Sequence, residues 1–265
     1  MLPIYEAIDV KNVISENVGH TKPWVILANT PQGLTPFVVK LFSTHQVDHC
    51  HSVSKEIFCN LLAREFDLRT PQCALIDIPV ELSYKLSQDA QFQYENADNR
   101  LKFATQMLAN VNNAMPTLGK NYFKNRISID TLYAFDNFIR NSDRGIRKPN
   151  LLLSKNDAFL IDHELALGET DITVINFNTL QLEDKFTKYH LFFSFLKNTK
   201  AKTRSNFFDE FSLYLYDLSI NKLTSYFDQL VNEGFNDYRQ PICNWIAQIK
   251  LNCSIFVDKL KGSLQ

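Results

Sequence analysis

The sequence predicts an α+β fold, with a β-rich N-terminal part followed by a mainly helical C-terminal part. Short runs with β-branched and aromatic centres, such as residues 35–41, recur through the first 110 residues and are typical of strands. From Ile127 onward, apolar residues recur instead at helical spacing. Residues 110–119 are rich in Asn, Pro and Gly and mark the boundary. We therefore expect one lobe at residues 1–110 and another at residues 111–265, together forming one domain.

The N-terminal part is expected to contain hairpins, one helix and a late strand. Residues 17–27 enter a strand through a polar segment, and a turn at residues 30–33 leads into the strand at residues 35–41. Residues 54–66 repeat apolar side chains at helical spacing and predict a helix. The remaining expected elements are an exposed polar loop at residues 87–100 and a strand at residues 101–108.

The C-terminal part is expected to be built from helices around one short hairpin. A helix with apolar side chains at Leu132, Phe135 and Ile139 leads into a polar loop. Apolar runs follow at residues 151–153 and 158–161, and the turn between them gives the pattern of a hairpin. Further helices are predicted at residues 186–196, 207–218, 223–231 and 241–260.

Three polar residues flank this hairpin and form the candidate site. Asp143 and Asn150 bound the polar loop, and Asp162 ends the second apolar run, so the hairpin would bring the second acid back to the first pair. Phosphoryl transfer requires such a group. One carboxylate takes the proton of the attacking hydroxyl, while an amide oxygen and a second carboxylate hold Mg²⁺ against the nucleotide phosphates. Asp and Asn are also common loop residues, so the complete arrangement is more specific than the pair alone.

The N-terminal part offers a cation and an acid that suit the same chemistry. Lys40 lies near the end of the strand at residues 35–41, where a cation would meet the α- and β-phosphates. Glu56 lies near the start of the following helix and would pair with Lys40. Each residue also has a simpler explanation, since strand-end lysines are commonly solvated and the helix dipole stabilises an N-terminal glutamate. The sequence has no G-x-G-x-x-G loop and no Walker sequence.

This arrangement resembles the catalytic segment of the HipA-like kinases, where an apolar helix precedes N-x-D-R, a short insert, P-N-L-L, a hairpin and I-D-H. The corresponding pieces here are Asn141-Ser142-Asp143-Arg144, Pro149-Asn150-Leu151-Leu152 and Ile161-Asp162-His163. Asn150 follows Asp143 by seven residues rather than by five as in ordinary protein kinases, and this longer loop is similar to one branch of the HipA-like group. The family usually has glycine after the D-H pair, whereas this chain has Glu164.

The resemblance extends into the N-terminal part and implies a two-lobed protein kinase-like fold that uses ATP and Mg²⁺. The stretch containing Gly19 and Thr21 is similar to a G-x-[ST]-x-P segment of the family, which implies contacts to the nucleotide. The strand at residues 101–108 would lead into the hinge that receives adenine, with Met107 and Leu108 as candidate contacts. The other implied roles are proton acceptor for Asp143, support of the loop or of the transferred group for Arg144, phosphate binding for Lys40 and Glu56, and metal binding for Asn150 and Asp162.

From the resemblance we expect an ATP-dependent kinase that transfers the γ-phosphoryl group to a serine or threonine of a protein. The family includes toxin kinases restrained by a small partner, so an antitoxin-like inhibitor is an expected partner beside the protein substrate. Two alternatives stay open. One is a pseudokinase that binds nucleotide or a partner without transfer, which Glu164 and the missing glycine-rich loop favour. The other is a lipid or small-molecule kinase, because phosphatidylinositol kinases have a similar D-R-x-x-x-N segment.

Composition and charge limit the partners, the cellular location and the metal sites that we expect for this chain. A formal net charge of -1 gives no broad attraction to nucleic acid or to an anionic membrane, so neither is an expected partner. No apolar run approaches the roughly 18 residues of a membrane helix, and the N-terminus shows no basic leader. The five cysteines form no C-x-x-C pair and are expected to be reduced thiols, which indicates a cytoplasmic protein. His45, His49, Cys50 and His51 suggest zinc, but no second ligand pair follows at finger spacing.

Overall fold

The computed structural model describes residues 1–14, 22–84, 86–115, 117–168 and 182–265 of the chain. The chain forms two compact units, each built from separate pieces of sequence. The first unit comprises Met1–Ile57, Pro71–Ala109 and Thr224–Asp237, and the second comprises Phe58–Thr70, Asn110–Leu223 and Tyr238–Gln265. The division into lobes at residues 1–110 and 111–265 stays a prediction.

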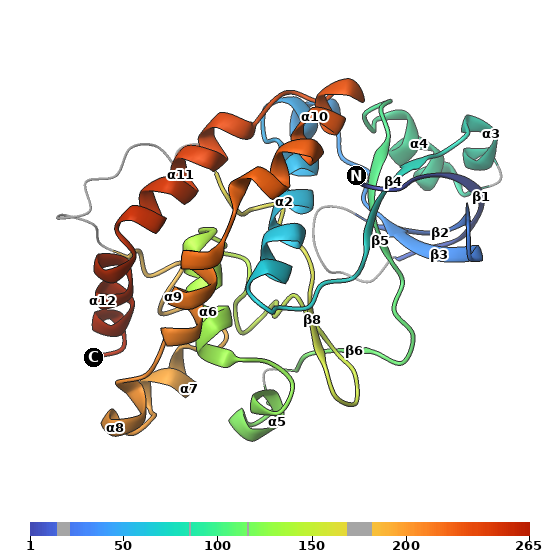
Figure 1. Cartoon of the computed structure of the whole chain (residues 1–265). Coiled ribbons are helices and arrows are strands. Elements are labelled where there is room, and N and C mark those ends of the chain that lie inside the picture. The colour runs from blue at the N-terminus through green and yellow to red at the C-terminus, as the bar shows by residue number, and fades with distance from the viewer. Residues whose placement is uncertain (15–21, 85, 116, 169–181) are drawn as a thin grey trace. The chain divides into compact units, whose positions relative to one another are not determined.

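A closed barrel forms the centre of the first unit (Figure 1). Its strands lie in the order β1-β2-β3-β5-β4, and β1 closes the barrel by pairing parallel to β4, whereas the other neighbours are antiparallel. The strands predicted at residues 35–41 and 101–108 are confirmed as β3 and β5, and the predicted turn joins β2 to β3. The strands are β1 (Ile4–Val13), β2 (Trp24–Thr30), β3 (Gly33–Val39), β4 (Cys73–Asp77) and β5 (Lys102–Gln106).

Small and branched apolar side chains fill the barrel around Trp24. Ile26, Val39, Ile76 and Ala104 are each fully buried and come from four different strands. The indole Nε1–H of Trp24 donates to Gln93 Oε1 at 3.1 Å, so the polar atom of the ring keeps a partner while its carbon atoms are buried.

Four of the helices that the structure describes lie entirely in the first unit, and one of them corrects a prediction. Residues 87–100 were expected to form an exposed loop, but most of them form α4. Ser87 caps this helix by accepting a hydrogen bond from the Ala90 amide, and Ala90 packs into the barrel core. The prediction is wrong because a single buried alanine on a polar helix gives almost no apolar periodicity. The helices are α1 (Thr44–Asp48), α3 (Val80–Ser83), α4 (Gln88–Glu95) and α10 (Thr224–Asn232).

The helix α10 belongs to this unit although it lies far along the sequence. The side chain of Gln229 exchanges two hydrogen bonds with the backbone of Leu2, at 2.7 and 2.9 Å. Arg100 donates to the carbonyl oxygen of Gly234 at 2.8 Å and also pairs with Asp48 and Asp98. These contacts join three distant stretches of sequence around the barrel.

The second unit is mainly helical and is organised around α6 (Ile129–Phe138). All but one of the residues of α6 are buried, and the indole of Trp245 donates to the carbonyl oxygen of Phe138 at 2.7 Å. Phe66 stacks on Phe211 with ring centroids 5.1 Å apart. The other elements are β6 (Asn112–Asn113), α5 (Lys120–Lys124), β7 (Leu151–Leu153), β8 (Ala158–Leu160), α7 (Phe193–Lys197), α8 (Ala201–Arg204), α9 (Asp209–Asp217), η2 (Ile220–Leu223), α11 (Arg239–Leu251) and α12 (Cys253–Ser263), while α2 (Ser52–Glu65) begins in the first unit and ends in the second.

Most of the predicted C-terminal elements are confirmed, with two corrections. The hairpin at residues 151–161 is β7 paired with β8, and the helix predicted at residues 207–218 is α9. Residues 241–260 do not form one helix, because the backbone breaks at Asn252 between α11 and α12. Of the helix predicted at residues 186–196 only the end forms, as part of α7, whereas residues 186–192 form turns from which the buried His190 bonds to Asp136. Within the described ranges, no helix is both long and apolar enough to cross a membrane.

Candidate functional site

A buried carboxylate on α6 is the foundation of the candidate site. Asp136 has no exposed surface, and its two oxygens accept hydrogen bonds from three side chains. Arg144 Nε donates to Oδ2 at 2.6 Å, His190 Nε2 donates to the same oxygen at 2.9 Å, and Asn141 Nδ2 donates to Oδ1 at 3.0 Å. An apolar helix therefore carries a charge into the core, where two of its three partners, Asn141 and Arg144, come from the loop that follows the helix.

The charge states in this cluster follow from its hydrogen bonds. Burial by itself raises the pKa of the Asp136 carboxyl, but the charge of Arg144 and the hydrogen bond from His190 outweigh it and lower that pKa to about 2. His190 Nδ1 accepts a hydrogen bond from the Phe192 amide at 3.1 Å, so the ring proton lies on Nε2 and the imidazole is neutral. The buried ion pair is therefore Asp136 with Arg144.

Arg144 connects the helix to both ends of the hairpin. Its fully buried guanidinium donates to the carbonyl oxygens of Pro149 and Asn150 and, at 3.2 Å, to Nε2 of His163. Those carbonyls end the polar loop, and His163 follows β8. The sequence left two roles for Arg144, support of the loop or of the transferred group. Its burial and its acceptors favour support of the loop.

The loop positions Asp143 and Asn150 together. The Asp143 amide donates to Asn141 Oδ1 at 3.0 Å, and Asn150 Nδ2 donates to both Asp143 Oδ2 and the Asp143 carbonyl oxygen at 2.9 Å. Gly145 fits here because a Cβ atom would lie 3.3 Å from the carbonyl oxygen of Tyr189. The backbone of Asn150 is left-handed, with φ of +46°, a conformation that asparagine adopts more readily than most residues.

The hairpin returns Asp162 to this loop, as the sequence predicts. The amide of Ile161 donates to the carbonyl oxygen of Asn150 at 3.1 Å, and Asp162 follows with φ of +63°. Lys148 lies between the two acids, with Nζ 2.7 Å from Asp143 Oδ2 and 2.8 Å from Asp162 Oδ2. Burial by itself lowers the pKa of the Lys148 ammonium, but the hydrogen bonds to Asp143 and Asp162 outweigh it and raise that pKa. Lys148 is therefore a cation at neutral pH.

The oxygen donors of this cluster fit Mg²⁺. Both hydrogen bonds of the Asn150 side chain are made through Nδ2, which orients the amide and leaves Oδ1 for a cation. Among the described residues, no hydrogen bond engages that oxygen. Asp162 adds a carboxylate that is partly exposed. Amide and carboxylate oxygens are the ligands that a hard divalent ion prefers.

In the first unit, the predicted pair of Lys40 and Glu56 is present as an ion pair. Lys40 lies one residue beyond β3, where its amide donates to the carbonyl oxygen of Phe103 at 3.1 Å. Glu56 lies on α2 and is almost completely buried, and the Lys40 ammonium is 5.7 Å from the centroid of the Phe42 ring. A buried carboxylate that holds a lysine at a strand end fixes the direction of the ammonium.

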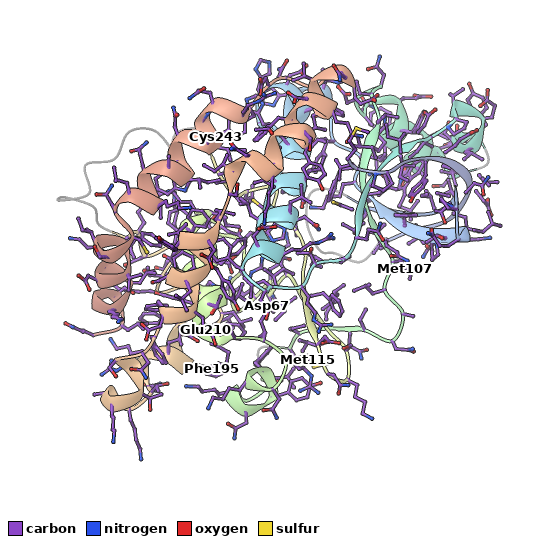
Figure 2. All side chains as sticks on the ribbon, in the orientation of Figure 1. Asp67, Met107, Met115, Phe195, Glu210 and Cys243 are labelled. Atoms are coloured by element: carbon purple, nitrogen blue, oxygen red, sulfur yellow. The ribbon has the colours of Figure 1, made fainter. Side chains whose placement is uncertain are left out.

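The remaining predicted nucleotide contacts have different outcomes. Gly19 and Thr21 lie outside the described residues. Met107 follows β5 directly, as Figure 2 shows, and its side chain is exposed, but its amide already donates to the carbonyl oxygen of Pro36 at 2.9 Å. Leu108 is partly buried beside it. The Met107 amide is therefore not available to adenine in this conformation.

The local backbone accommodates Glu164 at the position where the resemblance leads us to expect glycine. Glu164 is not among the residues with positive φ, whereas Asp162 and Leu167 are. The amide of Ala166 donates to the carbonyl oxygen of His163 at 2.9 Å, so the chain turns around position 164 without requiring glycine there. Glu164 is thus no evidence for a distorted site.

Sequence reasoning assigned no role to Asp136, His190 and Lys148, which the structure places in the cluster. An acid inside an otherwise apolar helix was the available signal for Asp136, because such a charge must have a partner. His190 lies 54 residues further along, so no local pattern connects the two. Lys148 stands two residues before Asn150, but a lysine in a polar loop is ordinarily solvated.

Comparisons with known proteins found one matching family model and a similar solved structure. A family model described as HipA-like kinase matches residues 11–219, which is more than half of the chain. The crystal structure of a Helicobacter pylori proinflammatory kinase, CtkA, is similar with a TM-score of 0.54 and 12% sequence identity, and the alignment covers 100% of this chain and 98% of that chain. At this identity the likeness concerns the fold, and it confirms the predicted α+β, kinase-like class. No curated protein matches the chain.

Proposed function

Because the chain belongs to the HipA-like kinase family, we propose that it transfers the γ-phosphoryl group of ATP to a serine or threonine hydroxyl of a protein. The observation that carries this proposal is the joining of Asp143, Asn150 and Asp162 by one partly buried network of hydrogen bonds and ion pairs. A proton acceptor and two oxygen ligands for Mg²⁺ are the groups that this chemistry requires.

Asp143 acts on the acceptor hydroxyl. As the hydroxyl oxygen bonds to the γ-phosphorus, its proton passes to the Asp143 carboxylate, and the bond from phosphorus to the bridging oxygen breaks with its electron pair remaining on ADP. The hydrogen bonds from Asn150 and Lys148 to Asp143 Oδ2 orient the carboxylate. They leave its other oxygen to face the acceptor.

The proposal also assigns the residues that bind the nucleotide. Asn150 and Asp162 would hold Mg²⁺, which neutralises phosphate charge when bound. Lys40, directed by Glu56, donates to the α- and β-phosphates. Gly19 and Thr21 as phosphate contacts, and Met107 and Leu108 as adenine contacts, complete the proposal from the family resemblance. For Met107 the carbonyl oxygen is the suitable group, since its amide is bonded to Pro36.

Arg144 acts through other residues. Its guanidinium binds Asp136, the carbonyl oxygens at the end of the loop and His163, so it sets the positions of Asn150 and of the segment that carries Asp162. We assign it a positioning role. A small inhibitory protein, as expected for a toxin kinase, is proposed as a partner on the family resemblance alone.

The test is transfer of label from γ-labelled ATP with Mg²⁺, in the presence and absence of a cell extract. Asp143→Asn should remove the transfer, whereas Asp217→Asn, an exposed acid on α9 with the same change of charge, should leave it intact. Acid hydrolysis of the labelled protein should yield phosphoserine or phosphothreonine.

Other outcomes distinguish the alternatives. Full activity of the Asp143→Asn variant would refute the assignment of the proton acceptor. Nucleotide binding without transfer to any acceptor would indicate a pseudokinase. Label recovered in lipid or in a small molecule, with none in protein, would change the acceptor class while keeping the chemistry.

A further inference from the structure

We propose that Lys148 is a further catalytic residue, which donates a hydrogen bond to the γ-phosphoryl group during its transfer. The inference rests on the proposed function and goes beyond the metal and base assignments. Its basis is the position of one ammonium group in contact with both Asp143 and Asp162.

Lys148 has one donor more than the acceptors that the described residues offer it. An ammonium group has three N–H donors. Two of them are directed at Asp143 Oδ2 and Asp162 Oδ2, at 2.7 and 2.8 Å, and the described residues offer no further acceptor to Lys148. The third donor remains for a ligand. Because the side chain is about one-third exposed, a ligand can reach it.

Lys148 also offsets negative charge at the site. Asp143 and Asp162 are carboxylates, and an anionic triphosphate bound beside them would be repelled by both. The positive charge of Lys148 lies between the two carboxylates and reduces that repulsion. Arg144 cannot serve instead, because its guanidinium is buried and bonded to Asp136, Asn150 and His163. The neighbouring Arg147 is exposed, and the salt bridges of Asp143 and Asp162 within the described part of the chain are made by Lys148 instead.

The backbone beside Lys148 is held in place by the residues that follow it. Lys148 is followed by Pro149, whose φ is restricted by its ring, and by Asn150, whose side chain and carbonyl oxygen are both bonded. The Arg144 guanidinium binds the carbonyl oxygens of Pro149 and Asn150, so the backbone beside the lysine is fixed to the core. An ammonium held in this way is preorganised for an incoming negative charge.

The proposed action involves no proton transfer from the lysine. While the acceptor oxygen bonds to the γ-phosphorus and the bond to the bridging oxygen breaks, Lys148 keeps its three protons and donates to a non-bridging oxygen of the moving group. The hydroxyl proton goes to Asp143, and the electron pair of the broken bond goes to ADP.

A binding experiment tests this contact without requiring turnover. We would measure the dissociation constants of ADP and of the non-hydrolysable analogue AMP-PNP, both with Mg²⁺, by calorimetry for the wild type and for Lys148→Met. Only AMP-PNP carries a γ-phosphoryl group. The variant should bind AMP-PNP about 10-fold or more weakly, as expected for a lost charge-assisted hydrogen bond, and ADP within about twofold of the wild type.

Kinetics complete the test. Lys148→Met should lower kcat about 100-fold or more, in line with the loss of one preorganised donor to the transition state, with a small change in the KM for the acceptor. Arg147→Ala removes a cation from the neighbouring position. It should leave unchanged both kcat and the ratio of the dissociation constants of AMP-PNP and ADP. Lys148→Arg keeps the charge and should retain part of the preference for AMP-PNP, and it replaces the Met variant if the latter fails to fold.

The outcomes separate this inference from the proposed function. Equal weakening of ADP and AMP-PNP, or no weakening of either, overturns the role of Lys148 even if the wild type transfers phosphate. Selective loss of AMP-PNP binding supports the contact even if no acceptor is found. Failure of the wild type to bind either nucleotide overturns both.

Discussion

Replacing Arg144 with methionine should destabilise the second unit more than any substitution on its surface. The guanidinium and the carboxylate of Asp136 are both fully buried, and their shortest contact is 2.6 Å. Methionine keeps most of the side-chain volume but leaves Asp136 with only the neutral donors His190 and Asn141. Removing one partner of a buried ion pair typically costs about 3–5 kcal/mol. With a urea m-value of roughly 2 kcal/mol/M, the unfolding midpoint should fall by about 2 M.

The two tryptophans allow this loss to be assigned to one unit. Trp24 belongs to the first unit and Trp245 to the second, and the chain has no others. In a Trp24→Phe background, fluorescence reports the surroundings of Trp245, whose indole bonds to Phe138 at the end of α6. Urea unfolding followed by this signal should show the full shift for Arg144→Met.

Two further variants make the reasoning refutable. Arg147→Met, an exposed change in the same loop, should alter stability by less than about 0.5 kcal/mol. Adding Asp136→Asn to Arg144→Met removes the unpaired charge and should restore about 1–3 kcal/mol, a coupling that a double-mutant cycle measures. A loss below about 1 kcal/mol for Arg144→Met, or strictly additive effects of the two changes, would show that the pair does not organise the unit.

Three other predictions concern acid stability, nucleotide binding and packing. Because the pKa of Asp136 is lowered to about 2, its ionised carboxylate contributes roughly 2 kcal/mol to the free energy of unfolding above pH 4, and this contribution is lost as the pH falls toward 2. Urea unfolding between pH 5 and 2 should show this dependence in the wild type. The double variant Asp136→Asn/Arg144→Met should lack it. Lys40→Met should weaken binding of AMP-PNP with Mg²⁺ by about 10-fold or more in calorimetry. Glu56→Gln keeps an acceptor for the ammonium and should weaken this binding less. Wild-type affinity in both variants would contradict the proposed role of the pair. Gly145→Ala should lower the free energy of unfolding in urea by about 1 kcal/mol, because the new Cβ would lie 3.3 Å from the Tyr189 carbonyl oxygen. An unchanged unfolding midpoint would show that the loop can shift freely.

The part of the site that could be predicted from sequence is the part that the chain builds locally. Asp143, Asn150 and Asp162 fall within twenty residues, and a hairpin of two three-residue strands is sufficient to bring them together. Apolar runs and turn residues carry that information directly. The pairing of Lys40 with Glu56 could also be predicted, because a strand end followed by a helix leaves few arrangements for the two charges.

The part that could not be predicted depends on tertiary packing. His190 reaches Asp136 only after the turns at residues 182–192 fold against α6, and aromatic residues in that stretch suggested a helix instead. The helix α4 was missed because its buried face consists mainly of Ala90. Similarly, Gln229 joins the first unit through the backbone of Leu2, a contact between distant segments that no periodicity records.

The anchoring of the polar loop at both ends has a consequence for engineering. Asn141 and Arg144 fix its start, and Asn150 fixes its end, while Ile146 and Arg147 between them are exposed. These two positions can therefore be randomised without altering the hydrogen bonds that set the reacting groups. A library at these positions would vary the exposed surface of the loop while both of its anchored ends stay in place.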